Sequence, residues 1–127
     1  MNLLLVDPKT ARSAAMAKSL ADEFGIAATC FQDSGLALES ALRSRPDGIL
    51  FAVEREEAYL QLRRLRHELP DIPVIVSSNR DDAASVRRAL SSGATDYLVE
   101  PKAGEVAYAL LRILERFGRE GRYKLSA

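Results

Sequence analysis

The chain of 127 residues is poor in cysteine and aromatic residues and has no excess of either charge sign. Its single cysteine, Cys30, excludes a disulfide framework and a cysteine metal site, and favours a reducing compartment. The 18 basic and 18 acidic side chains cancel, so no global field attracts nucleic acid or an anionic membrane. No apolar run is long enough to span a membrane, and residues 3–6 are too short a run for a signal peptide. We therefore expect one cytoplasmic domain that binds neither membrane nor, by itself, nucleic acid.

Short apolar runs alternate with segments of helical periodicity along almost the whole chain. With 47% apolar and 28% charged side chains, a chain of this length buries one sizeable core. The apolar runs, typical of strands buried on both faces, are residues 3–6, 26–31, 48–53, 74–77 and 96–99. The helical segments are 11–24, a segment capped by Asp33, 56–69, a segment starting at Asp81 or Asp82, and 104–118. This alternation predicts an α/β fold, a doubly wound parallel sheet of five strands with five helices on its two faces.

Finer features follow from single residues. Thr10 is a candidate N-cap and Gly25 a stop signal for the first helix. Apolar periodicity predicts that Leu42 and Leu90 face the core, and Cys30 is expected to be a small core side chain. Residues 1–118 form the predicted domain, whereas the basic segment 119–127 loses the helical period and is expected to be a fraying end or a linker.

The predicted carboxyl ends of the central strands carry Asp7, Ala52, the pair Ser77 and Ser78, and Glu100 followed by Pro101. In an open α/β sheet such ends lie side by side along one edge, where ligands bind. Ala52 is the unexpected member of this set, because a methyl group neither holds a metal ion nor accepts a transferred group.

Four stretches resemble the receiver domain of two-component response regulators, in order and at matching spacing, over about residues 2–118. They are LLVD at 4–7, PDGILFA at 46–52, IPVIVSS at 72–78 and GATDYLVEP at 93–101. The resemblance implies a CheY-like, flavodoxin-like sheet with strand order 2-1-3-4-5. In that family an acidic pair after the first strand and an aspartate after the third bind Mg²⁺, and that aspartate accepts a phosphoryl group. A hydroxyl residue after the fourth strand and a lysine before a proline after the fifth then contact the phosphate.

Carried over position by position, the resemblance keeps some of these groups and loses others. Asp7, the hydroxyl of Ser78 and the aromatic ring of Tyr97 are present. The second acidic position holds Pro8, the position of the phosphate-accepting aspartate holds Ala52, and the lysine position holds Glu100. Losing two of three carboxylates leaves a poor Mg²⁺ site, and a glutamate in place of lysine repels phosphate. We therefore expect a pseudo-receiver with no catalytic residue, no resident metal and no cofactor, which is not an enzyme.

Glu54, two residues beyond Ala52, is the remaining carboxylate near this edge. An alternative is that Asp7, Glu54 and Glu100 hold a divalent cation in a different way. The favoured interpretation is that Glu54 and Glu100 are solvated or paired with nearby cations: Lys9, Arg55, Arg80 or Lys102. The resemblance also makes the Glu100–Pro101 bond a candidate cis peptide.

A polar surface on the last two helices and the last strand is the candidate interaction face; its members are Arg87, Arg88, Asp96, Tyr97, Tyr108 and Arg112. In receivers the corresponding face binds protein partners or a second receiver, and a homodimer through it is one expectation; plain exposure to solvent is the alternative. The arginines of segment 56–69, including Arg66, are interpreted as a solvated face.

The sequence therefore favours a phosphorylation-independent signalling domain that acts by protein–protein interaction. One alternative is a receiver module of a longer transcriptional regulator with a DNA-binding output domain, for which the basic tail would be the linker. Another is an unrelated enzyme on the same fold. Against the enzyme, the segment 7–10 after the first strand lacks the glycines of a phosphate-binding loop.

Overall fold

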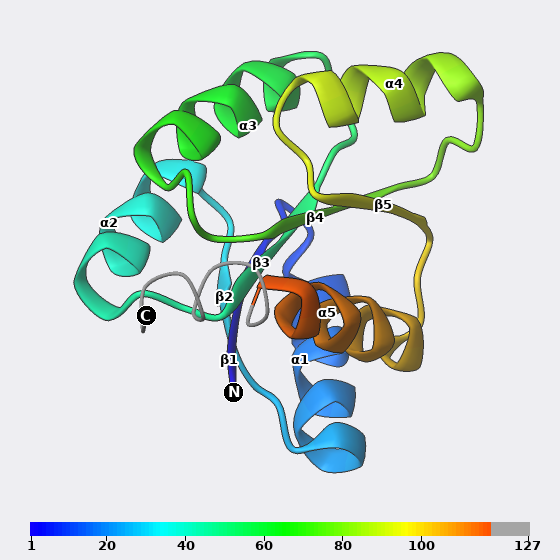
Figure 1. Ribbon diagram of the computed structural model, residues 1–127. Helices are drawn as coiled ribbons and strands as arrows, with labels where there is room; N and C mark the ends of the chain where they lie inside the picture. The colour runs from blue at the N-terminus through cyan, green and yellow to red at the C-terminus, as the bar shows by residue number, and fades with distance from the viewer. Residues whose placement is uncertain (118–127) are drawn as a thin grey trace.

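The computed structural model describes residues 1–117, in which five strands alternate with five helices (Figure 1). In chain order they are β1 (Asn2–Val6), α1 (Thr10–Phe24), β2 (Ala27–Phe31), α2 (Ser34–Ser44), β3 (Gly48–Ala52), α3 (Glu57–Glu68), β4 (Val74–Ser78), α4 (Ala83–Ser91), β5 (Asp96–Val99) and α5 (Ala103–Phe117). The prediction of strands and helices is confirmed in number, type and order.

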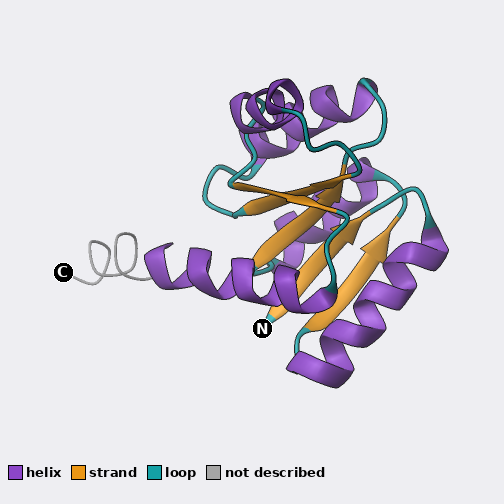
Figure 2. Ribbon diagram, turned by 90° about the vertical axis from the view of Figure 1, so that its right-hand side faces the viewer, coloured by secondary structure: helices purple, strands orange, loops and turns teal. Residues whose placement is uncertain are grey.

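All strand pairs are parallel, and the strand order is β2-β1-β3-β4-β5. Helices cover both faces of this sheet (Figure 2). The predicted doubly wound, flavodoxin-like architecture with order 2-1-3-4-5 is therefore confirmed. The register aligns the carboxyl ends of β1, β3 and β4, because Val6 pairs with Phe51 and Ala52 pairs with Ser77.

Alternating side chains of each central strand enter two separate cores, as the period of two in a strand requires. Leu4 and Val6 of β1 join the core under α2, α3 and α4. Leu3 and Leu5 join the core under α1 and α5. β3 is buried along its whole length, which explains why its sequence shows no polar alternation.

Several helix ends follow predictable chemistry. Gly25 ends α1 in the left-handed conformation with φ 65°, which only glycine adopts without cost. The carboxylates of Asp33 and Asp82 accept backbone N–H bonds at the starts of α2 and α4. The Thr10 prediction is wrong, because Lys9 occupies the N-cap position and its side chain makes no cap bond.

Some burial predictions are also wrong. Leu42 is 51% exposed and Leu90 is 47% exposed, because α2 packs through Ala37 and Ala41 and α4 packs through Ala89. These short helices approach the sheet on small residues, so the neighbouring leucines turn outward. Cys30 is exposed on β2, which lies at the sheet edge and pairs only with β1.

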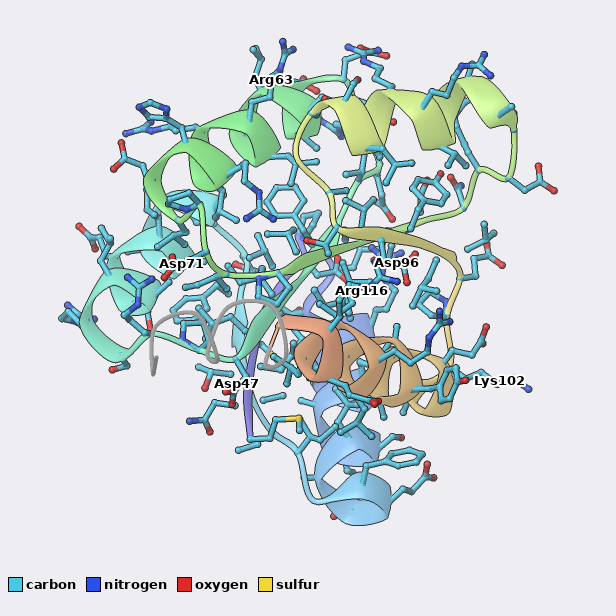
Figure 3. The ribbon with its side chains drawn as sticks, in the orientation of Figure 1. Asp47, Arg63, Asp71, Asp96, Lys102 and Arg116 are labelled. Carbon is cyan, nitrogen blue, oxygen red and sulfur yellow. The ribbon has the colours of Figure 1, made fainter. Side chains whose placement is uncertain are left out.

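The sequence predicts that Arg66 of α3 is solvated. That prediction is wrong, because Arg66 is half-buried and binds the segments that precede β4 and β5. Its guanidinium donates hydrogen bonds to the carbonyl oxygens of Leu69, Pro70, Ile72 and Gly93 and to Thr95 Oγ1, at 2.8–3.2 Å. Burial lowers the pKa of Arg66. Arg63, by contrast, lies on the outer side of α3 and points away from the sheet (Figure 3).

The predicted tail, 119–127, and residue 118 lie outside the described residues. Within residues 1–117, no helix has the length and apolar character needed to cross a bilayer.

Candidate functional site

A cavity of about 370 Å³ opens at the carboxyl ends of the central strands, beside the start of α1. Its lining combines apolar, hydroxyl and charged side chains: Leu5, Asp7, Lys9, Arg12, Ser13, Met16, Leu50, Ala52, Glu54, Ser77, Ser78, Asn79, Glu100 and Pro101. The structure thus brings together the residues predicted from the strand ends, with the exception of Pro8. Pro8 is exposed and lines a neighbouring hollow that includes Gln32 and Gln61.

Asp7 is buried at the end of β1, and both of its carboxylate oxygens accept hydrogen bonds. Arg12 Nε lies 2.7 Å from Oδ2 and Arg12 Nη2 lies 2.7 Å from Oδ1. The backbone N–H of Lys9 donates to Oδ1 at 2.9 Å. A bidentate guanidinium is the strongest neutralising partner available to a carboxylate. Asp7 is therefore already fully engaged within the protein.

The same guanidinium reaches a second carboxylate across the cavity mouth. Arg12 Nη1 lies 2.7 Å from Glu54 Oε1, and Lys9 Nζ lies 3.6 Å from that oxygen. The hydrogen bonds to Asp7, and to a smaller extent those to Glu54, raise the pKa of Arg12 above its ordinary value despite opposing desolvation. Arg12 thus ties the loop after β1 to the loop after β3. Glu54 therefore pairs with Lys9, one of the four cations that the sequence offered as partners, and with Arg12, which sequence reasoning missed.

Ala52 and Ser78 occupy the strand ends between these loops. Ala52 is 8% exposed and presents a methyl group to the cavity. Ser78 is also buried, and its Oγ accepts a hydrogen bond from the backbone N–H of Arg80 at 3.2 Å. This edge of β3 and β4 therefore offers hydroxyl groups but no carboxylate.

Glu100 lies at the exposed end of β5 with φ 42°, in the left-handed region. Its backbone N–H donates to Ser78 O at 2.9 Å, which closes the end of the sheet. The prediction of a cis bond before Pro101 is wrong, because no cis peptide occurs among residues 1–117. Asp7, Glu54 and Glu100 do not converge, and the described residues hold no group of three histidine, cysteine or acidic side chains placed to bind a metal.

The candidate interaction face contains both free and occupied side chains. Arg88 forms an ion pair with Glu56 and stacks over the Tyr59 ring, 4.3 Å from its centroid, so it joins α4 to α3. Burial raises the pKa of Tyr59. Arg87 is exposed beside it.

The rest of this face lies on β5 and α5. Tyr97 Oη donates to Arg80 O at 2.6 Å, and Arg112 stacks on the 64% exposed Tyr108, 5.6 Å from its ring centroid. Asp96 is half-buried in a hollow that Arg112 and Arg116 also line. Asp96 and Arg116 are labelled in Figure 3.

Comparison with known proteins gives consistent sequence relatives. The chain is 38% identical over 100 residues to the transcriptional regulatory protein CseB of Streptomyces coelicolor, covering 76% of this chain and 42% of that protein. It is 33% identical over 118 residues to the response regulator MprA of Mycobacterium leprae, covering 91% of this chain and 51% of that protein. No protein-family model matches the chain.

Solved receiver structures share the fold. The receiver domain of the Francisella response regulator 1452 superposes with a TM-score of 0.77 at 25% identity, covering 91% of this chain and 97% of that one. The chain is a response regulator receiver domain. A signal receiver domain of a histidine kinase from Syntrophus aciditrophicus superposes on this receiver with a TM-score of 0.77 at 27% identity, covering 93% of this chain and 92% of that one.

The receiver spans about half the length, 42% and 51%, of the two curated relatives described above. Both relatives are named as regulators. The site just described corresponds to the edge of the sheet that the sequence resemblance indicated.

Proposed function

We propose that this receiver domain does not accept a phosphoryl group and acts by binding a protein partner. The single observation that carries the proposal is the arrangement of Arg12 between Asp7 and Glu54 beside the methyl group of Ala52. The guanidinium of Arg12 binds both oxygens of Asp7, which a bound metal ion would otherwise need. Ala52, at the position of the phosphate-accepting aspartate, has no group that accepts a phosphoryl group.

The residues present do not fit Mg²⁺. This ion demands near-octahedral oxygen ligands at about 2.0–2.1 Å. Both oxygens of Asp7 are bound to Arg12, and Glu54 accepts from the same guanidinium. A metal would have to displace that guanidinium and would then find no carboxylate at Ala52.

The negative charge of Glu100 supports the same conclusion. Glu100 lines the same cavity as Ser77 and Ser78. A phosphate that entered this cavity would meet a charge of the same sign, and like charges repel. The receiver pattern has a lysine at the position of Glu100, so the charge of the side chain at this position is reversed.

An interaction role needs two conformations or a fixed binding surface, not phosphate itself. A partner that prefers one conformation shifts the population just as a covalent modification does. We place the partner surface on α4, β5 and α5, with Arg87, Asp96, Tyr97, Tyr108 and Arg112 as its members. A second copy of the chain is one partner that this surface is proposed to bind.

The direct test is incubation with acetyl phosphate and Mg²⁺, followed by intact-mass spectrometry. We expect no added phosphoryl mass. A stable acyl phosphate on the domain would contradict the proposal. A receiver of the usual pattern, treated in parallel, is the positive control.

A second candidate function rests on the lengths of the relatives. Because the chain matches about half of each of two relatives, one of them named as a transcriptional regulatory protein, we propose as the alternative that the domain serves a DNA-binding output domain in a longer protein. A mobility-shift assay distinguishes the two. The alternative predicts DNA binding by a longer native form but not by residues 1–127; failure of both to bind would contradict it.

A further inference from the structure

The geometry points to the cavity beside Ala52 as a binding site for a primary ammonium group on a short aliphatic stem, such as a lysine side chain of the partner protein. This inference rests on the proposal that the cavity no longer holds phosphate. It names the chemistry that occupies the cavity instead.

The cavity has an apolar floor. Leu5, Leu50 and Ala52 are 2–8% exposed, and half-buried Met16 adds a flexible apolar wall. The volume of about 370 Å³ lies within the range of about 300–1,000 Å³ typical of small-molecule sites. An aliphatic stem of a few methylenes gains free energy by covering such a floor.

The charges around the cavity are not balanced. Three carboxylates and two cations line it. Asp7 and Glu54 are paired with Arg12 and, for Glu54, with Lys9. The Glu100 carboxylate forms no hydrogen bond or ion pair with any of residues 1–117. One unmatched negative charge therefore remains in the lining of the cavity.

Hydrogen-bond acceptors line the same cavity as Glu100. The hydroxyls of Ser77 and Ser78 and the amide of Asn79 line the cavity with Glu100. An ammonium group has three donors and no acceptor, so it matches a carboxylate with neighbouring hydroxyl and amide oxygens. A phosphate or carboxylate ligand would instead meet Glu100 and find Arg12 already occupied.

The experiment is an NMR titration of the ¹⁵N-labelled chain with Nα-acetyl-lysine methylamide. We expect saturable shifts of the Ala52, Ser77, Ser78 and Glu100 amides with a dissociation constant of about millimolar, as one small fragment allows. The Nε-acetylated compound, which has the same stem without the charge, is expected not to bind. Equal binding of both compounds, or no saturable shift with either, would overturn the site.

Substitutions in the lining test whether the ligand binds within the cavity. Glu100→Gln is expected to weaken binding about three- to tenfold, the range for one partly exposed charge-assisted contact. Glu39→Gln, which removes an exposed carboxylate from α2, is the matched control and should leave binding unchanged. Ala52→Leu fills the floor and should abolish binding. An unchanged affinity in Glu100→Gln would overturn the proposal even if Ala52→Leu does not fold.

A further comparison separates the source of the ammonium group. A lysine-containing peptide that binds more tightly than n-butylamine indicates a partner protein, whereas equal affinity indicates a free amine. Failure of the titration together with an unphosphorylated domain would remove only the ammonium site. Acyl phosphate formation would instead remove the proposed function on which the site rests.

Discussion

At the scale of single residues, Arg12 explains more of the site than any residue found from the sequence. The motif around Asp7 indicated a carboxylate at a strand end, and that prediction was right. Nothing in the local pattern marked Arg12, which lies in the first turn of α1 among small residues. The available signal was its position five residues after Asp7, because a helix beginning at Thr10 turns that side chain back over the strand end.

Replacing Arg12 tests whether the bridge stabilises the fold. Arg12→Ala leaves the largely buried carboxylate of Asp7 without its bidentate partner. Since Arg12 is about half exposed, with a relative side-chain accessibility of 46%, we expect a loss of about 1–2 kcal/mol in unfolding free energy. Urea denaturation measures this loss.

Arg12→Lys is the matched control, because lysine retains the charge but not the fork geometry. We expect an intermediate stability for this variant. Equal stability of the wild type and both variants would mean that the bridge contributes nothing to folding.

At the scale of elements, the sequence predicted the strands and most helices correctly but misjudged which faces they bury. Continuous apolar runs are sufficient to find strands such as β3, which is buried on both faces. Periodicity fails for α2 and α4, because these helices bury alanines and expose Leu42 and Leu90. Close packing on small residues is decided by neighbouring elements, and no local pattern encodes it.

Arg66 holds the end of α3 against the start of β4 and the turn before β5. Arg66→Ala removes a half-buried guanidinium that satisfies four carbonyls and one hydroxyl. We expect a loss of about 2–3 kcal/mol in unfolding free energy, because three of the four carbonyl bonds that are lost lie in partly buried positions. Chemical denaturation measures the change.

Arg63→Ala is the matched control on the same helix, since Arg63 is exposed on its outer side. It should change stability by less than about 0.5 kcal/mol. Similar losses in the two variants would show that the hydrogen bonds of Arg66 do not account for the effect.

Asp82 makes the stability of α4 depend on pH. Hydrogen bonds from the Ser85 hydroxyl and backbone N–H lower the pKa of Asp82. A depressed folded-state pKa stabilises the fold above the unfolded value of about 3.9, and this contribution is lost as pH falls through the lower folded value. The stability difference between wild type and Asp82→Ala should therefore stay constant at neutral pH and shrink below about pH 4.

Asp82→Asn separates the charge from the cap. Asparagine also caps helices but does not titrate, so its advantage over Asp82→Ala should not vary with pH. Thermal denaturation between acid and neutral pH measures both differences. A wild-type advantage that persists unchanged in acid would contradict the assignment of the pKa shift to this cap.

At the scale of the whole molecule, the candidate site lies at the carboxyl ends of the central strands, whereas the candidate interaction face lies on α4, β5 and α5. The sequence resemblance suggested both, but it did not show which residues of the candidate face are already paired within the chain. Arg88 is paired with Glu56 and stacked on Tyr59 within the chain. Arg87 and Arg112 are therefore better probes of a partner surface, since altering Arg88 also loosens α4 from α3.

Self-association tests this surface. If the chain forms the proposed homodimer through α4, β5 and α5, charge reversal in Arg87→Glu or Arg112→Glu should weaken it by about tenfold. Glu39→Gln, on α2, should not change it. Sedimentation equilibrium gives the dissociation constants. Dimers that resist both reversals would place the contact on another face.

The central claim is that several coordinated changes, and not Ala52 alone, remove phosphoryl chemistry from this receiver. The most direct measurement compares the wild type, Ala52→Asp and the triple variant Pro8→Asp, Ala52→Asp, Glu100→Lys, each treated with acetyl phosphate and Mg²⁺ and analysed by intact mass. We predict no acyl phosphate on the wild type and little on Ala52→Asp, because Pro8 leaves the metal short of a carboxylate and Glu100 repels phosphate. We predict clear modification of the triple variant, in which the added carboxylate at position 8 lets Mg²⁺ compete with Arg12 for Asp7. Efficient phosphorylation of the wild type or of Ala52→Asp would contradict the account.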